Sequence, residues 1–155
     1  MLVTKTAVSL QTPRGGWPGV PDARRRIMRA IRSAHTRPEL AVRSLAHRLG
    51  FRFRLHRAGL PGKPDLVFPG RRRIVFVHGC FWHQHKGCKN ASVPRTRADY
   101  WKQKLQANKA RDVHNESLLR EAGWQTLVLW ECELKHEPNV ARKLIRFLRA
   151  KTETR

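Results

Sequence analysis

Three cysteines and one histidine place the strongest constraint on how this chain can fold. Cys80, His85 and Cys88 lie close together, and Cys132 lies far downstream. Three thiolates and one imidazole form a closed tetrahedral ligand set for Zn²⁺, and a set without an open position is structural. Such an ion would fasten the loop that carries the first three ligands to the end of a distant strand. The alternative is that the cysteines are buried or incidental and that the His-rich loop is exposed.

The net charge indicates a polyanionic partner. The 155 residues include 33 Lys and Arg against 11 Asp and Glu, a formal net charge of +22. Self-repulsion of this size opposes a compact state unless a polyanion shares the surface, so we expect nucleic acid as the partner. Basic residues occur along the whole chain, including Arg24–Arg26 and Arg71–Arg73, and do not form one basic tail. A ribosomal-type binding protein, or a genome that favours Arg, would also explain the charge.

The expected compartment is cytoplasmic and reducing. Met1–Leu10 contains a Lys and no sufficient apolar run, so it does not resemble a secretion signal. No stretch is long and apolar enough to suggest a membrane partner. The length fits one domain. We expect residues 1–20, which are rich in Gly and Pro, to be a flexible arm and residues 21–155 to form a single domain.

Apolar periodicity predicts an α/β fold in which helices flank a mixed sheet. In the helix that begins near Pro38, Leu40 is expected on the apolar face, and Thr96 is expected to cap a later, long helix. The alternation of Phe51, Phe53 and Leu55 with basic residues predicts the first strand of a β-meander. The predicted elements are helices over residues 21–34 and 38–49, strands over 51–55, 65–68 and 74–77, a helix from the Thr96 cap to 122, a strand over 124–130 and a helix over 138–150.

A second group of residues indicates phosphodiester chemistry. Asp65 begins one strand of the meander and His78 ends the next, so the fold can bring a carboxylate beside His78 and His83. Mg²⁺ takes oxygen ligands and neutralises charge on phosphoryl oxygens. A histidine nearby can serve as a general base because it is half-neutral near physiological pH. The alternative is that both histidines are solvated or stacked structural residues.

Two adjacent aromatic residues, Phe81 and Trp82, lie in a segment expected to be a loop. Neighbours on an extended loop cannot easily both point into a core. An apolar wedge between base steps is one way in which proteins unstack a duplex, so the pair is a candidate wedge. Membership of the hydrophobic core is the alternative.

Several segments of the chain resemble the very-short-patch (VSR) mismatch repair endonucleases. The matching segments are LPGKPD (60–65), VHGCFWHQHKGC (77–88), VPRTRADYW (93–101), Asn108 with Asp112, WEC (130–132), MRAI (28–31) and Glu39. The resemblance implies a restriction-endonuclease-like fold and nicking of the strand that carries the mispaired thymine of a T:G mismatch, which starts repair of deaminated 5-methylcytosine. A nuclease of the same fold with another target, and a zinc-stabilised nucleic-acid-binding protein without catalysis, are the competing interpretations.

The resemblance also implies roles for individual residues. Asp65 and the backbone carbonyl of Val77 would bind a catalytic Mg²⁺, His83 would activate water, and His78 would assist at the phosphate or leaving group. Structural Zn²⁺ would occupy the four Cys and His ligands named above. Val77 stands where the family commonly has Thr, and Lys86-Gly87 changes the spacing between two zinc ligands. Residues expected to enter the base stack are Phe81, Trp82 and Met28, and those expected to support the catalytic residues or contact DNA are Glu39, Trp101, Asn108 and Asp112.

The resemblance makes double-stranded DNA with a T:G mismatch the expected partner. Other mismatch-repair proteins are further candidate partners, and we expect a monomer. DNA binding would place the protein at the nucleoid within the cytoplasm.

Overall fold

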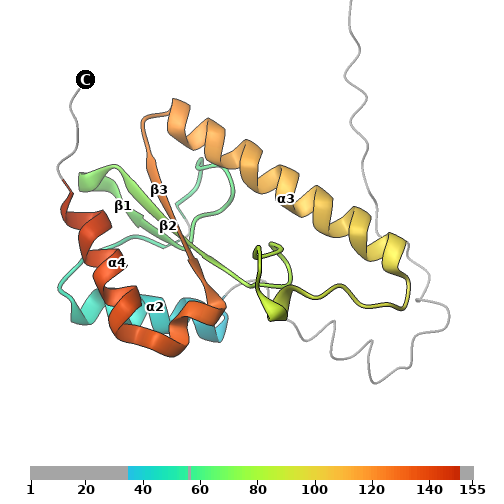
Figure 1. Ribbon diagram of the computed structural model, residues 1–155. Coiled ribbons are helices and arrows are strands. Elements are labelled where there is room, and N and C mark those ends of the chain that lie inside the picture. The colour runs from blue at the N-terminus through green and yellow to red at the C-terminus, as the bar shows by residue number, and fades with distance from the viewer. Residues whose placement is uncertain (1–34, 56, 151–155) are drawn as a thin grey trace, which may run out of the picture. The chain divides into compact units, whose positions relative to one another are not determined.

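The computed structural model describes residues 35–55 and 57–150 (Figure 1). The expected arm, the first predicted helix, Arg24–Arg26 and Met28 lie outside the described residues. The regular elements are α2 (Arg37–Arg48), β1 (Leu66–Phe68), β2 (Arg73–His78), α3 (Ala98–Glu121), β3 (Gln125–Trp130) and α4 (Glu137–Arg149), with short 3₁₀ helices η1 (Pro69–Arg71), η2 (Lys89–Ala91) and η3 (Glu131–His136). None of the described helices combines the length and apolarity that a membrane crossing requires.

The described strands form one mixed sheet in the order β1-β2-β3. β1 pairs with β2 in antiparallel orientation, and β2 pairs with β3 in parallel orientation up to His78 opposite Trp130. The carboxyl ends of β2 and β3 therefore lie side by side. Chain segments that leave these two strands, including those with Cys80 and Cys132, begin at the same edge of the sheet.

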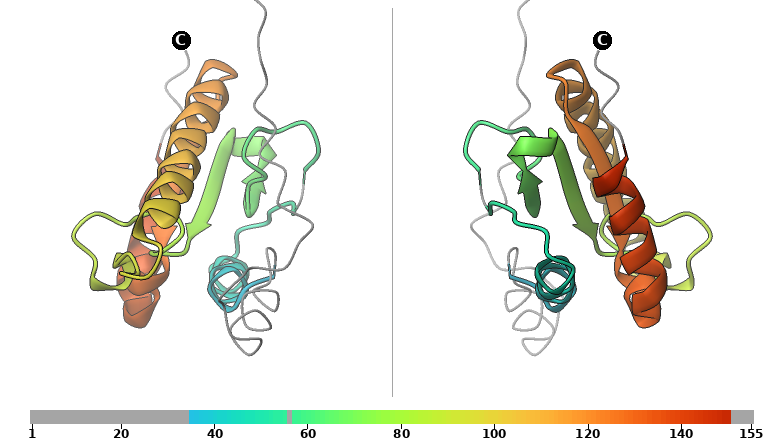
Figure 2. Two further views of the ribbon diagram at one scale, coloured as in Figure 1. Left: turned by 90° about the vertical axis from the view of Figure 1, so that its right-hand side faces the viewer. Right: turned by 90° about the vertical axis from the view of Figure 1, so that its left-hand side faces the viewer.

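Helices cover both faces of the sheet, as the periodicity predicts. On one face, α2 and α4 pack against Leu66, Phe68 and Val75, while on the other face Leu119 of α3 packs against Val67 and Ile74. The two views of Figure 2 look from opposite sides, with α3 in front in one and α4 in front in the other. Consecutive strand residues thus alternate between two apolar layers, which explains why β1 and the start of β2 are buried throughout.

The ends of the helices agree only in part with the predicted signals. Thr36 caps α2 by accepting a hydrogen bond from the Glu39 N–H, but Leu40 is 49% exposed, so its assignment to the apolar face was wrong. Thr96 does not cap α3. The helix begins at Ala98, and Arg97 takes the N-cap position in the left-handed conformation, which leaves Thr96 one residue too early to cap the first turn.

Residues 51–55 do not form the predicted strand. Arg54 makes a single antiparallel bridge to Val67, with N–H···O distances of 2.8 and 2.9 Å. β1 has only three residues, so it offers little edge for a further strand. Phe51 is buried in the core between the helices and the sheet, whereas Leu55 is 38% exposed.

The arginine triplet Arg71–Arg73 donates hydrogen bonds to carbonyl groups at the ends of two helices. Arg71 donates to the carbonyl of Leu148, and Arg72 donates to the carbonyl of Ala122 at the end of α3. Arg73 is 1% exposed and donates to the side chain of Gln125 and, at the end of α4, to the carbonyls of Phe147 and Ala150. A cation complements the negative end of a helix dipole. Arg73 is thus enclosed in the fold and does not form part of an open nucleic-acid-binding surface, whereas Arg71 and Arg72 are exposed.

Candidate active site and metal centre

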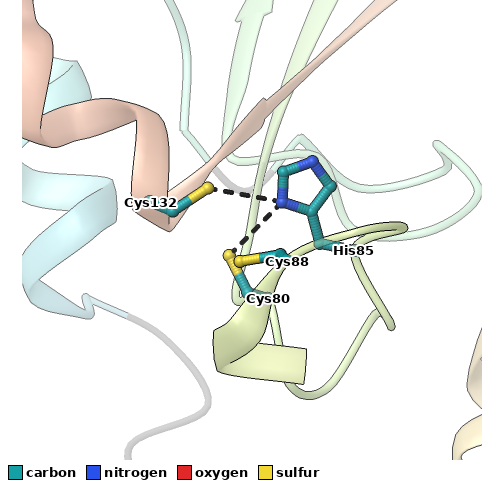
Figure 3. A group of neighbouring side chains, drawn as sticks. All are labelled: Cys80, His85, Cys88 and Cys132. Carbon is teal, nitrogen blue, oxygen red and sulfur yellow. Dashed lines mark hydrogen bonds between the residues drawn. The ribbon is translucent and has the colours of Figure 1, made fainter. Parts of the chain in front are cut away.

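The four predicted zinc ligands converge at the edge where β2 and β3 end (Figure 3). Cys80 follows β2, Cys132 lies just beyond β3, and His85 and Cys88 come from the loop between β2 and α3. His85 Nδ1 lies 3.7 Å from Cys80 Sγ and 3.3 Å from Cys132 Sγ. One ligand atom from each of the four residues lies within 4.8 Å of the others. We call these four residues the Cys/His cluster.

The geometry of the Cys/His cluster fits a tetrahedral cation. Bond lengths of about 2.3 Å to sulfur and about 2.0–2.1 Å to nitrogen place neighbouring S and N ligands roughly 3.5 Å apart, close to both measured distances. Both sulfurs face one ring nitrogen, which has a single lone pair and accepts one hydrogen bond. A shared cation would satisfy all of these atoms. Without a cation, burial raises the pKa of the Cys80 thiol to about 12.

Asp65 is held against the end of β2. Its Oδ2 accepts a hydrogen bond of 2.7 Å from the Val77 N–H, across the pairing of β1 with β2. Burial raises the pKa of Asp65 to about 6, although the Val77 hydrogen bond acts in the opposite direction, and the charge of Glu39 raises the pKa further. A half-buried carboxylate with a raised pKa is one that a nearby cation would stabilise.

Two histidine rings stack beside this carboxylate. The rings of His78 and His83 have centroids 3.8 Å apart and planes that differ by 9°. His83 Nδ1 lies 2.6 Å from Asp112 Oδ2 on α3. A carboxylate only accepts hydrogen bonds, so Nδ1 carries the proton and Nε2 of a neutral ring keeps its lone pair. Burial, followed by the charge of His83, lowers the pKa of His78 to about 4, so this ring is neutral at pH 7.

His78, His83 and Asp112 suit proton transfer better than metal binding. Their ligand atoms lie within 4.8 Å of one another, but the lone pairs of two parallel imidazoles lie in two parallel planes. A cation about 2 Å from both nitrogens would be displaced from each ring plane. The hydrogen bond to Asp112, in contrast, orients His83 as the third group of a catalytic triad orients its base.

Glu39 and Arg43 of α2 form a buried ion pair behind Asp65. Glu39 Oε2 lies 3.1 Å from Arg43 Nη2 and also accepts the N–H of His35. Both charges act on the pKa of Asp65, with Glu39 raising it and Arg43 lowering it. Glu39, expected to support the catalytic residues, is therefore near them. No role for Arg43 was predicted from the sequence, because its position in the helical periodicity indicates only a residue on the surface of a helix.

Three aromatic side chains gather beside the histidines. Phe81, Trp82 and Trp101 form a half-buried cluster with centroid separations of 5.1 to 6.1 Å. The segment is a hydrogen-bonded turn, with the His83 N–H donating to the Gly79 carbonyl, and not an extended loop. Asn108 on α3 contacts the Trp82 carbonyl at 3.4 Å. The partial exposure of both candidate wedge residues leaves them accessible to a ligand.

Trp130 is a site residue that the sequence reasoning did not assign. Its ring stacks on His85 at 4.1 Å with planes 6° apart and meets the His78 ring at 5.4 Å and 75°. In the sequence, Trp130 ends a predicted strand, two residues before Cys132. Of these two residues, only the cysteine suggested a role.

The chain is similar to known DNA endonucleases. The family model described as DNA mismatch endonuclease Vsr matches residues 20–90, a span that contains Asp65, His78 and His83. The chain is 56% identical over 114 residues to the type II nicking enzyme V.XorIIP of Xanthomonas oryzae pv. oryzae (74% of this chain, 83% of the relative). It is 38% identical to the type II nicking enzyme V.NmeAIP of Neisseria meningitidis (79% and 87%) and 44% identical to the DNA mismatch endonuclease Vsr of Escherichia coli (70% and 69%).

Proposed function

The chain belongs to the Vsr family of DNA mismatch endonucleases, and we propose that it nicks one strand of double-stranded DNA beside a T:G mismatch by Mg²⁺-dependent hydrolysis. The observation that carries the proposal is the hydrogen bond of His83 to Asp112, next to the half-buried carboxylate of Asp65. The names of the relatives, nicking enzymes and a mismatch endonuclease, support the same reaction.

His83 is the proposed general base. Its Nε2 takes the proton of the attacking water, while Asp112 holds Nδ1–H and stabilises the imidazolium that results. Neutral His78, stacked on His83, donates a ring N–H to a phosphate oxygen and leaves proton removal to its partner. The two histidines thus divide two roles, proton removal from water and hydrogen bonding to the phosphate.

Asp65 and the Val77 carbonyl would bind Mg²⁺, an ion that prefers oxygen ligands. When bound, the ion neutralises charge on the phosphoryl and leaving oxygens. The Val77 N–H fixes one oxygen of the Asp65 carboxylate and so orients the group. The buried pair of Glu39 and Arg43 adds little net charge beside it.

The Cys/His cluster would hold structural zinc. The distances around His85 and the convergence of three thiols and one imidazole support this assignment. The ion would tie the loop after β2 to the end of β3. The segment that carries Phe81, Trp82 and His83 would thereby be fixed at the edge of the sheet.

The aromatic cluster of Phe81, Trp82 and Trp101 would read the mismatch. Insertion of apolar side chains costs less where base stacking is already weakened. Lys104 lies 5.7 Å from the centre of the Trp82 ring, which gives the cluster a cationic neighbour suited to phosphate. Basic residues elsewhere on the surface would supply the salt-dependent affinity for the duplex.

The test uses matched T:G and T:A duplexes, each strand labelled separately, with Mg²⁺ or with a chelator. We expect a nick in the thymine strand of the T:G duplex when Mg²⁺ is present. The His83→Ala variant should be slowed by roughly 10² to 10⁴-fold, whereas His114→Ala, an exposed histidine on α3, should react at the wild-type rate. Equal cutting of both duplexes would indicate a general nuclease, and tight binding without any nick would indicate a binding protein.

A further inference from the structure

Four aromatic rings form a continuous row that connects the Cys/His cluster to the histidine pair, His78 and His83. His85 stacks on Trp130, Trp130 meets His78 edge to face, and His78 stacks on His83. The successive centroid separations are 4.1, 5.4 and 3.8 Å. Trp130 is the member of this row that has no role in metal binding or proton transfer.

The strand register explains why Trp130 occupies this place. Trp130 and His78 are paired at the carboxyl ends of the parallel strands β3 and β2. Each is followed two residues later by a cysteine of the cluster, Cys132 and Cys80. The same register that brings the two cysteines together therefore brings the indole between a ligand of the cluster and a histidine of the pair.

The contacts of Trp130 restrict both rings. A flat stack on His85 limits rotation of that imidazole about its side-chain bonds, because any turn would lose contact over the whole ring face. The edge contact with His78 limits the position of the ring on which His83 stacks. The backbone N–H of Trp130 donates to Glu133 at 3.1 Å, which fixes the start of η3.

We propose that Trp130 is a positioning residue that couples the Cys/His cluster to the histidine pair. Order at the cluster is passed through the indole ring to His78 and then to the hydrogen bond between His83 and Asp112. This inference rests on the proposed function for its kinetic effect, and on the ring contacts alone for the coupling itself.

The experiment compares zinc-loaded, full-length wild type with Trp130→Leu, Trp130→Phe and the control Trp124→Leu. Trp124 is equally an indole and is buried, but it precedes β3 at the opposite end of the strand. The readouts are the single-turnover nicking rate on T:G duplex, duplex affinity, zinc release to a coloured chelator, and the exchange with water of the His83 Nδ1 proton in NMR spectra.

We expect Trp130→Leu to slow nicking by about 10 to 100-fold, the usual effect of removing a group that orients metal-site ligands, with duplex affinity unchanged. Zinc release and exchange of the His83 proton should both become faster. Trp130→Phe, which keeps a flat ring, should recover most of each property. Trp124→Leu should lower the melting temperature and leave the other readouts at wild-type values.

The proposal is overturned if Trp130→Leu nicks DNA, releases zinc and exchanges the His83 proton at the rates of the wild-type protein. Equal losses in Trp124→Leu would do the same, because they would reduce the effect to general destabilisation. A wild-type protein that does not nick would overturn the proposed function only, since zinc release and proton exchange report the coupling independently.

Discussion

Substitution of Arg73 tests whether this basic residue stabilises the fold or binds a phosphate of the duplex. Arg73 is 1% exposed, and its guanidinium donates to Gln125, Phe147 and Ala150, with distances of 2.9 Å to Gln125 Oε1 and 2.7 Å to the Ala150 carbonyl. It also lies 5.3 Å from the centre of the Phe147 ring. The informative substitution is Arg73→Met, which keeps an unbranched side chain but removes every donor and the charge.

The magnitude follows from opposing contributions. Leaving two helix-end carbonyls without their donor costs roughly 1–3 kcal/mol each, and loss of a cation at a partly buried helix end costs up to about 2 kcal/mol. Burial of the guanidinium is itself unfavourable, as the lowered pKa of Arg73 indicates, and methionine relieves this cost. We therefore expect a net loss of about 2–4 kcal/mol in the free energy of unfolding. The melting temperature should fall by roughly 5–15 °C.

The assay is thermal unfolding followed by circular dichroism, together with duplex affinity as a function of salt. Arg149→Met is the matched control, because it makes the same charge change at an exposed position in the last turn of α4. The control should shift stability by at most about 0.5 kcal/mol. The reasoning is refuted if Arg73→Met melts like the control and instead reduces the slope of log affinity against log salt by about one unit, the sign of a lost phosphate contact.

Three further predictions concern the site. Cys132→Ser should bind less zinc by elemental analysis and melt roughly 10 °C lower, since zinc binding energy is also folding energy; a well-folded wild-type protein without zinc would contradict this. Because burial raises the pKa of Asp65 to about 6, Mg²⁺ must displace a proton below that pH, so its affinity in calorimetry should fall by up to about tenfold per pH unit below pH 6 and stay constant above it. A flat profile from pH 5 to 7.5 would rule out Asp65 as the titrating ligand. The double substitution Phe81→Ala/Trp82→Ala should reduce nicking of T:G duplex far more than binding to matched duplex, whereas parallel loss of melting temperature and all binding would show that these rings hold the fold.

Elements with a single strong local signal were predictable from the sequence. The apolar run in β2 and the periodicity of α4 correspond to the observed elements within a residue or so. The alternation at Phe51, Phe53 and Leu55 was misleading, because alternation describes side-chain direction and a strand also needs a partner edge. The three-residue β1 provides one bridge only.

The convergence of the four Cys and His side chains was predictable, because their donor atoms together form a recognisable ligand set. Three thiols and an imidazole suggested one shared ion before any distance was known, and the family resemblance is confirmed by the comparisons. The hydrogen-bond partner of His83 could not be predicted from sequence spacing, because Asp112 lies on a helix far along the chain. The direction of the Asp112 side chain depends on how α3 packs. Trp130 carries no metal-binding or acid–base group, so only the measured ring contacts reveal its place.

The connection from β2 to α3 is the segment that structural zinc at the Cys/His cluster would stabilise. Residues 79–97 contain only the short helix η2, yet they carry His83 and two of the aromatic residues proposed to meet DNA. Irregular connections longer than about 12–15 residues are uncommon in compact domains unless they serve a function, and a mobile connection would not hold a general base within hydrogen-bond distance of Asp112. The sheet itself offers little support to this connection, since β1 is short and β3 ends at the same edge as β2. With zinc bound, the four residues of the Cys/His cluster, three from this connection and one just beyond β3, would supply the missing attachment. Zinc would therefore serve catalysis without contacting the phosphate, by keeping the segment between Cys80 and Cys88 in one conformation while the duplex is deformed against it.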